Sequence, residues 1–335
     1  SPSSRRRESA CVPSATCSER RRRLPGRLPL ALALVAGVTV LGTLPAAAAP
    51  PEISAVDLEL DGPAVNIDDP CFWVNPADPA GALVFTTSKR TKVVEAYSVE
   101  TGALVATIPG FTKPNNCWVE GDLLLTTDRN AHNVKVHHVP DLRFVRTFAA
   151  DTLAPMGIAA LHTRDGKTLV YVSDEGDASV HAYDLATFAP VRTFATGFGL
   201  LIEPLATDDL YQRLFVAREE EGGHGIGLFT PEGTLVREFG GNTFAFDTEG
   251  IALYRCGEGG YLLASDQHLT ATEFEVFDRV SLQHLGTFIV QDGTGEYIDA
   301  TDGIEILQTP TPRFPNGVLA ACDGCGDSLP DETDL

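Results

Sequence analysis

Short runs of Val, Ile, Leu, Thr, Phe and Tyr recur along residues 50–335, separated by Gly, Pro, Asp and Asn. Apolar and polar positions alternate within many of these runs, which is the pattern of half-buried strands. The residues between the runs are turn formers, and helical periodicity is nearly absent. The pattern therefore predicts an all-β chain built from short strands and turns.

The strands also recur as a repeated unit of about 45 residues. Each copy opens on one of the runs LVFTTSK, LLLTTDR, LVYVSDE, LFVARE, YLLASDQ and VLAACDG, and equivalent places are held by Thr87, Thr127, Ser173, Ala217, Ser265 and Cys322. A strand-only repeat of this length is typical of a propeller whose blades have four strands. Six copies predict a six-bladed β-propeller with four-stranded antiparallel blades.

The sixth copy is short. Only residues 324–335 follow its second strand, which is too few to complete a blade. We therefore predict an incomplete last blade, with residues 52–60 supplying a strand that fills part of the gap and closes the ring.

The first 49 residues differ from the rest of the chain. Residues 1–49 carry eight Arg and only two acidic residues, and an apolar run at 28–44 is followed by a cluster of alanines. This order is the layout of a secretory signal with cleavage near residue 49. A membrane anchor is the alternative, but Pro29 and Gly37 interrupt a run already shorter than the roughly 20 residues of a spanning helix. We expect an exported propeller, periplasmic or extracellular, at residues 50–335.

The remaining 286 residues are strongly acidic. They hold 17 basic and 44 acidic residues, a net charge of −27. Such a surface repels nucleic acid and anionic membranes. In an exported protein, abundant carboxylates favour hard cations, with Ca²⁺ first. Solubility alone is the other explanation of the acidity, and the two are compatible.

Five cysteines remain in this part of the chain. Export permits disulfides, and Cys322-x-x-Cys325 is either a disulfide or half of a zinc site, although a second such pair and a nearby His are missing. Cys71 and Cys117 occupy equivalent inner strands of adjacent blades and should lie close together. We expect two buried thiols there, because neighbouring inner strands are often farther apart than the ~7 Å Cα limit for a disulfide.

Polar residues recur where each predicted inner strand begins, in NIDDPCFWV, KPNNCWV, APMGIAAL, LIEPLATDD, FDTEGIALY and ATDGIEIL. Innermost strands line the central channel of a propeller, and the loops after the second strands return to the same mouth. The mouth should therefore hold carboxylates with a few cations. Close like charges require counter-ions such as Ca²⁺, and the cations suit an oxyanion such as phosphate. A single Asp here is more often a turn former, so the prediction depends on the recurrence.

These residues resemble the β-propeller phytase family, secreted bacterial enzymes that release phosphate from phytate with calcium. The resemblance covers roughly residues 65–324, and it is carried by DDPCFWVNP (68–76), TTSKR (86–90), DRN (128–130), LATDDLYQRLFVAREE (205–220), DTEGIALYRCGEGGYLLASDQ (247–267) and TDGIEIL (301–307).

The resemblance implies a set of functional residues. The implied calcium ligands are Asp68, Asp69, Glu203, Glu219, Asp247, Glu249 and Asp302. The implied catalytic and phosphate-binding residues are Lys89, Arg90, Arg129 and Glu219. Two positions depart from the family, because Met156 stands where it usually has Tyr and Asp174 where it has a phosphate-binding Lys. The charge reversal at Asp174 is expected to weaken phytate binding.

The implied activity is a 3-phytase-like phosphomonoesterase that acts as a monomer on phytate or a related ester. Several Ca²⁺ ions would bridge the phosphate oxygens and activate a water molecule that attacks phosphorus directly, without a covalent intermediate. Propellers host many functions, so two alternatives stay open. One is a non-catalytic, calcium-stabilised binding module, and the other is a phosphodiesterase or lactonase-like hydrolase on the same fold.

Overall fold

The computed structural model describes residues 52–54, 56–60, 62–199, 201–219, 225–291 and 295–325. The chain divides into two units, residues 1–49 and 50–335, and the predicted signal segment falls on the first, outside the described residues. Among the residues that are described, no helix is long and apolar enough to cross a membrane.

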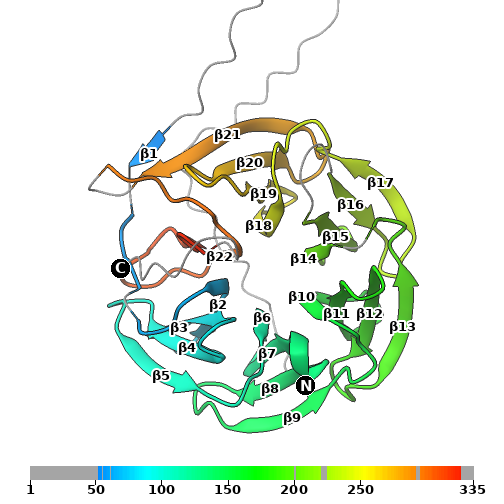
Figure 1. Cartoon of the computed structure of the whole chain (residues 1–335), viewed down its shortest axis with the longest axis horizontal. Helices are drawn as coiled ribbons and strands as arrows, with labels where there is room; N and C mark the ends of the chain where they lie inside the picture. Colours follow the sequence, from blue (N-terminus) through cyan, green and yellow to red (C-terminus); the bar gives the residue numbers. More distant parts are fainter. Residues whose placement is uncertain are drawn as a thin grey trace, which may run out of the picture. The chain divides into compact units, whose positions relative to one another are not determined.

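Five blades of four antiparallel strands are arranged in chain order around a common centre (Figure 1), with the first strand of each blade innermost. Blades 1 and 2 are β2 (Ile67–Asn75), β3 (Asp78–Ser88), β4 (Val93–Ser98), β5 (Leu104–Ile108), and β6 (Pro114–Glu120), β7 (Leu123–Asp128), β8 (Asn133–His138), β9 (Phe144–Phe148). Blade 3 is β10 (Pro155–His162), β11 (Thr168–Asp174), β12 (Ser179–Asp184) and β13 (Pro190–Ala195). Blades 4 and 5 are β14 (Ile202–Asp208), β15 (Arg213–Arg218), β16 (Ile226–Phe229), β17 (Leu235–Phe239), and β18 (Thr248–Cys256), β19 (Gly259–Asp266), β20 (Glu273–Asp278), β21 (His284–Gln291).

The hydrophobic core lies between the blades. Tyr171 of β11 and Phe215 of β15 are fully buried, because the middle strands of a blade are covered on both faces by neighbouring blades. The outermost strands keep exposed positions, such as Val105 in β5 and Val236 in β17. This difference explains why the second strand of each repeat is mostly apolar and buried, while most positions of the fourth strand are exposed.

A hydroxyl in the second strand ties four of the five blades to the next, and blade 4 has Ala217 at this position. Thr127 accepts a hydrogen bond from the Asn116 N–H at 2.9 Å and donates one to the Met156 carbonyl of blade 3 at 2.7 Å. Ser173 likewise accepts a hydrogen bond from the Gly157 N–H and donates one to the Glu203 carbonyl of blade 4, both at 2.8 Å. Equivalent bonds are made by Thr87 and Ser265. The recurring hydroxyl in the repeats therefore holds the inner strands in a ring.

Replacing Thr127 with Val should destabilise the propeller by about 1–3 kcal/mol, because the change leaves a buried N–H and a buried carbonyl without their partner. Thermal or urea unfolding measures the loss. The matched control is Thr147→Val on the exposed strand β9, which should change stability little. Equal losses of stability at the two positions would show that the hydroxyl of Thr127 does not stabilise the contact between blades 2 and 3.

The prediction of six blades is wrong. In the described part of the chain, the sixth position holds the two-stranded sheet of β22 (Ile304–Leu307) and β23 (Val318–Ala321), and β22 lies beside both β18 and β2. β1 (Glu52–Ser54) does not complete this sheet, because it pairs in parallel with β21 at the outer edge of blade 5.

The sixth position is joined to blade 1 by other means. The Arg313 guanidinium donates to the carbonyls of Asp57 and Glu100, and Leu58 packs in one cluster with Val318. A complete blade would have two more strands outside the short sheet. Here loop contacts connect the short sheet to blade 1 instead.

Four of the five cysteines that the structure describes form two disulfides. Cys71 and Cys117 are close, as predicted, but the expectation of two thiols is wrong. Their Cα atoms are 5.8 Å apart, within the range of a disulfide, because Cys117 lies one position nearer the mouth than the residue level with Cys71. Cys322 and Cys325 are also disulfide-bonded, with Cα atoms 6.0 Å apart, which excludes the zinc alternative for this pair.

Candidate functional site

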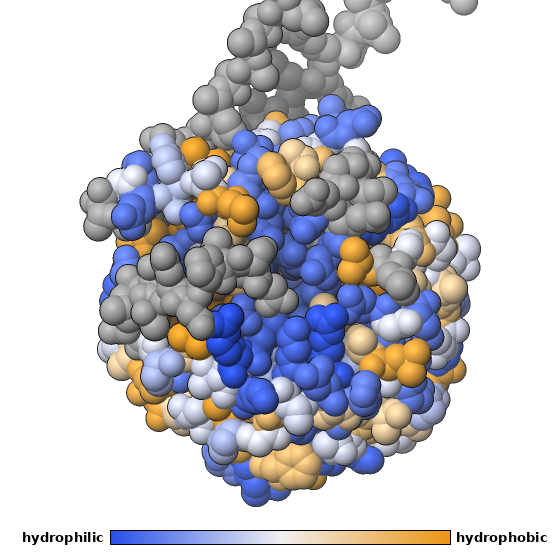
Figure 2. Space-filling view, in the orientation of Figure 1, coloured by the Kyte–Doolittle hydropathy of each residue, from blue (hydrophilic) through white to orange (hydrophobic). Residues whose placement is uncertain are grey.

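The inner strands all begin at the same mouth of the channel, and the pairing register places equivalent residues there. A bulge after the first residue of β2, β6, β10, β14 and β18 is shared by the five blades, so their entry residues align. The aligned residues are Asp68, Asn115, Met156, Glu203 and Glu249, and Asp302 precedes β22. Figure 2 shows hydrophilic residues gathered around the centre of one face of the propeller.

Three glutamates form a carboxylate cluster at the mouth. Oxygen atoms of Glu203, Glu219 and Glu249 all lie within 4.8 Å of one another. Glu203 and Glu249 are buried, and the Asn115 amide donates to Glu203 at 2.8 Å. Burial, and then the charges of neighbouring carboxylates, raise the pKa values of Glu203 and Glu249 well above the usual range. Burial raises the pKa of Glu219 to about 7.

Lys89 contacts one carboxylate of blade 1 and one carboxylate that precedes the sheet in the sixth position. Its Nζ lies 3.3 Å from Asp68 and donates to Asp302 at 3.0 Å. Gln267 donates to the other oxygen of Asp302 at 2.6 Å. Since the Lys89 side chain is 9% exposed, it balances the charge of the buried carboxylates beside it.

Asp69 lies one residue further along its inner strand than the aligned entry residues, and so deeper in the channel. It accepts a hydrogen bond from the Cys117 N–H at 2.9 Å and lines a cavity with Asn116 and Glu305. Burial raises its pKa well above the usual range, and burial raises that of Glu305 to about 7. Sequence reasoning missed Glu305, although it stands in the quoted TDGIEIL stretch three residues after Asp302.

The other predicted residues lie around the mouth. Arg129 forms an ion pair with Glu175 from the adjacent blade. Arg90 is exposed in the loop after β3, and Asp247 directly precedes β18. The structure thus brings Lys89, Asp68, Asp302 and the three glutamates together, and the charge of Asp247 acts on Glu249 of this group.

The expectation that Asp174 faces the substrate is wrong. Asp174 is fully buried, and its oxygens accept hydrogen bonds from the N–H groups of Leu153, Ala154 and Gly176 at 2.6 to 2.9 Å. Burial opposes its ionisation, but His181 and these N–H groups lower its pKa. The equivalent Asp128 and Asp266 bind loop N–H groups in the same way, so this position holds the incoming loop in blades 2, 3 and 5.

Met156, the other departure from the family, is buried in β10, and its carbonyl accepts the hydrogen bond from Thr127. Its contribution to the mouth is therefore apolar, where a Tyr would add a hydroxyl.

The glutamate cluster fits calcium. Its donors are carboxylate oxygens, the ligands that Ca²⁺ prefers. Glu219 Oε2 and Asn115 Oδ1 are buried, and neither has a hydrogen-bond partner among the described residues. Buried acceptors of this kind are normally satisfied, and a cation at the cluster would satisfy that of Glu219. It would also offset the repulsion that raises the pKa values of Glu203 and Glu249.

The fold and the site define an all-β propeller with a ring of carboxylates and a few cations at one mouth. Comparison with known families agrees, since residues 186–328 match the model of the family described as Phytase. This confirms the resemblance on the part of the chain that holds Glu203, Glu219, Asp247, Glu249 and Asp302.

A solved structure described as "Structure of U3-55K" superposes with a TM-score of 0.53 at 17% identity. The match covers 79% of this chain and 76% of that one, and at such low identity it shows the fold alone.

Proposed function

We propose that this chain is an exported, calcium-dependent phosphomonoesterase that hydrolyses phytate or a related phosphate ester. The observation that carries the proposal is the cluster of Glu203, Glu219 and Glu249 at the mouth, where the charge of Lys89 acts on all three carboxylates. The cluster lies in the part of the chain that matches the phytase family.

The glutamates would hold the cation, and Asn115 keeps Glu203 oriented by donating to it. Calcium, when bound, would supply a Lewis acid for the phosphate oxygens. Asp68 and Asp302 already share the positive charge of Lys89. They therefore complete a negatively charged rim to which a divalent cation is attracted.

The cations of blades 1 and 2 would bind the ester. Arg90 is exposed and the Arg129 side chain is 25% exposed, so a phosphate at the mouth can reach both. Guanidinium groups make charge-assisted, frequently bidentate hydrogen bonds to phosphate oxygens. With Lys89 beside them, these groups would stabilise the charge on the equatorial oxygens during transfer to water.

The test is phosphate release from inositol hexakisphosphate by the purified chain, with calcium and with a chelator. We expect release only with calcium, and a loss of about 10²-fold in kcat for Glu249→Gln, since loss of one electrostatic contact at the transition state typically costs that much. Glu232→Gln, at an exposed turn, is the control for net charge. A chain that binds calcium but releases no phosphate from any ester would instead be the non-catalytic binding module.

A further inference from the structure

The residue after the second strand holds the same place in all five blades. Its backbone N–H donates to the carbonyl of the residue just before the inner strand of its own blade, at 2.9–3.1 Å in every case. The five equivalent residues are Lys89, Arg129, Glu175, Glu219 and Gln267. Glu175, not Asp174, is therefore the residue of blade 3 that corresponds to Lys89 and Arg129.

The side chain of Glu175 contacts the cation of the preceding blade. Arg129 Nη2 donates to Glu175 Oε2, and the two side chains are 25% and 17% exposed. The charge of Glu175 also raises the pKa of Glu219. Glu175 thus interacts both with a cation of the proposed phosphate site and with a carboxylate of the proposed calcium site.

We propose that Glu175 is a specificity-determining residue that selects against densely phosphorylated substrates. It engages a donor of Arg129 that a second phosphate group would need, and it adds negative charge where that group would lie. An ester with one phosphate, held at the glutamate cluster and Lys89, does not have to displace it. This inference rests on the proposed function, because it concerns the substrate of the same site.

The consequence can be measured as a change in substrate preference. At about 4 Å, two unit charges in water interact by an energy equivalent to about fivefold in affinity. Glu175→Gln should therefore lower KM for inositol hexakisphosphate about fivefold, and Glu175→Lys should lower it further. The kcat, and the KM for p-nitrophenyl phosphate, should stay within about twofold for Glu175→Gln, because Glu175 engages only the Nη2 donor of Arg129 and a single phosphate does not need that donor. Glu175→Asp, which keeps the charge, should resemble the unchanged chain.

The experiment uses the calcium-loaded chain and adds a binding measurement that needs no catalysis. Inositol hexakissulfate carries six negative groups and no phosphate, and its affinity by calorimetry should rise for Glu175→Gln but not for Glu232→Gln. If both substitutions raise the affinity equally, only net charge matters and the assignment is overturned, as it is if neither changes it. If the chain releases no phosphate while Glu175→Gln alone tightens hexakissulfate binding, the proposed activity fails and the role of Glu175 stands.

Discussion

Chelation of calcium should lower the melting temperature of this protein, and the difference between calcium and chelator should widen as the pH rises. A ligand that binds only the folded state at 100 times its dissociation constant adds about 2.7 kcal/mol per site. In a propeller of this size each kcal/mol corresponds to roughly 2 °C, so one occupied site should raise the melting temperature by about 5 °C.

The pH dependence follows from the glutamate cluster. Without a cation, Glu203, Glu219 and Glu249 have folded-state pKa values above the ordinary 4.5, and that of Glu219 is about 7. The folded state then holds more protons than the unfolded state, so this contribution to stability is complete below about pH 4.5 and is lost as the pH rises through 7. Bound calcium replaces the protons, so the loss should be seen mainly in chelator.

Calorimetry at several pH values, in calcium and in chelator, measures both effects. The double variant Glu203→Gln Glu249→Gln should remove most of the calcium effect and flatten the dependence in chelator, whereas Glu232→Gln should leave both. Melting temperatures that coincide in calcium and chelator at pH 8 would contradict calcium binding at this cluster.

Sequence repetition predicts most of this fold for a physical reason. Hydroxyls recur at Thr87, Thr127, Ser173 and Ser265 because each joins two inner strands. A contact that is made again in each blade requires the same kind of residue at the same position of each repeat. The carboxylates of the mouth were predictable in the same way, since equivalent entry residues must meet around one channel. The same repetition overestimated the blade count, because the sixth copy repeats only the first two strands.

Some features change when the pairing of two strands shifts by one residue, and these could not be predicted from the sequence. In blade 3 two acids are adjacent, and only the pairing of Pro155 with Asp174 shows that Asp174 holds a loop while Glu175 faces Arg129. The Cys71–Cys117 disulfide depends in the same way on the distance between inner strands, here 5.8 Å between Cα atoms. Glu305 was missed because the cavity that it lines is formed by residues far from it in the chain, among them Asp69 and Asn116.

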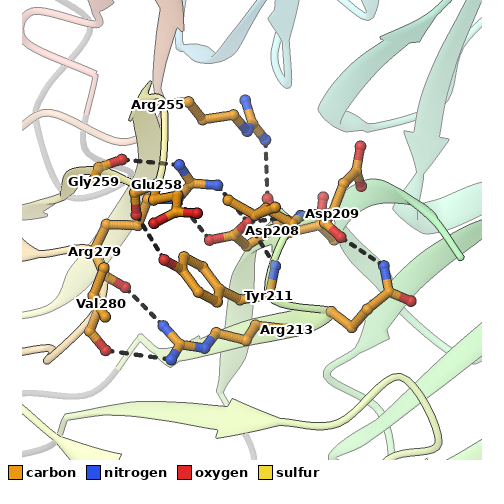
Figure 3. A network of polar contacts seen from close by, with 12 residues as sticks. Asp208, Asp209, Tyr211, Arg213, Arg255, Glu258, Gly259, Arg279 and Val280 are labelled. Atoms are coloured by element: carbon orange, nitrogen blue, oxygen red, sulfur yellow. Dashed lines mark hydrogen bonds and ion pairs between the residues drawn. The ribbon is translucent and has the colours of Figure 1, made fainter. Parts of the chain in front are cut away.

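A buried ion pair joins blades 4 and 5 at the end of the channel away from the mouth (Figure 3). Asp208 ends the inner strand β14, and Arg279 follows β20. The guanidinium donates to both Asp208 oxygens, at 2.7 and 2.6 Å, and to the carbonyls of Gly257 and Gly259. The two side chains are 2% exposed or less, so water cannot replace either partner.

Replacing Arg279 with Met should destabilise the protein by about 3–5 kcal/mol, because it leaves the buried Asp208 carboxylate without its counter-ion. Burial opposes ionisation of Asp208, and Arg279 is the main group that nevertheless lowers its pKa. The stability from this pair is therefore present above the ordinary pKa of 3.8 and is lost as the pH falls below it. Calorimetry should show a fall of roughly 6–10 °C at pH 7.

The control for Arg279→Met is Arg237→Met, since Arg237 is an exposed side chain that donates to the Ser281 carbonyl and should cost under ~1 kcal/mol. Adding Asp208→Asn to Arg279→Met should recover part of the loss, because a neutral amide is less costly to bury than an unpaired carboxylate. The whole length of β14 separates this pair from Glu203, so phosphate release measured well below the melting temperature should be unchanged. If Arg279→Met and Arg237→Met have the same melting temperature, the ion pair contributes no more to stability than a surface contact. The junction of blades 4 and 5 then depends on its apolar core instead.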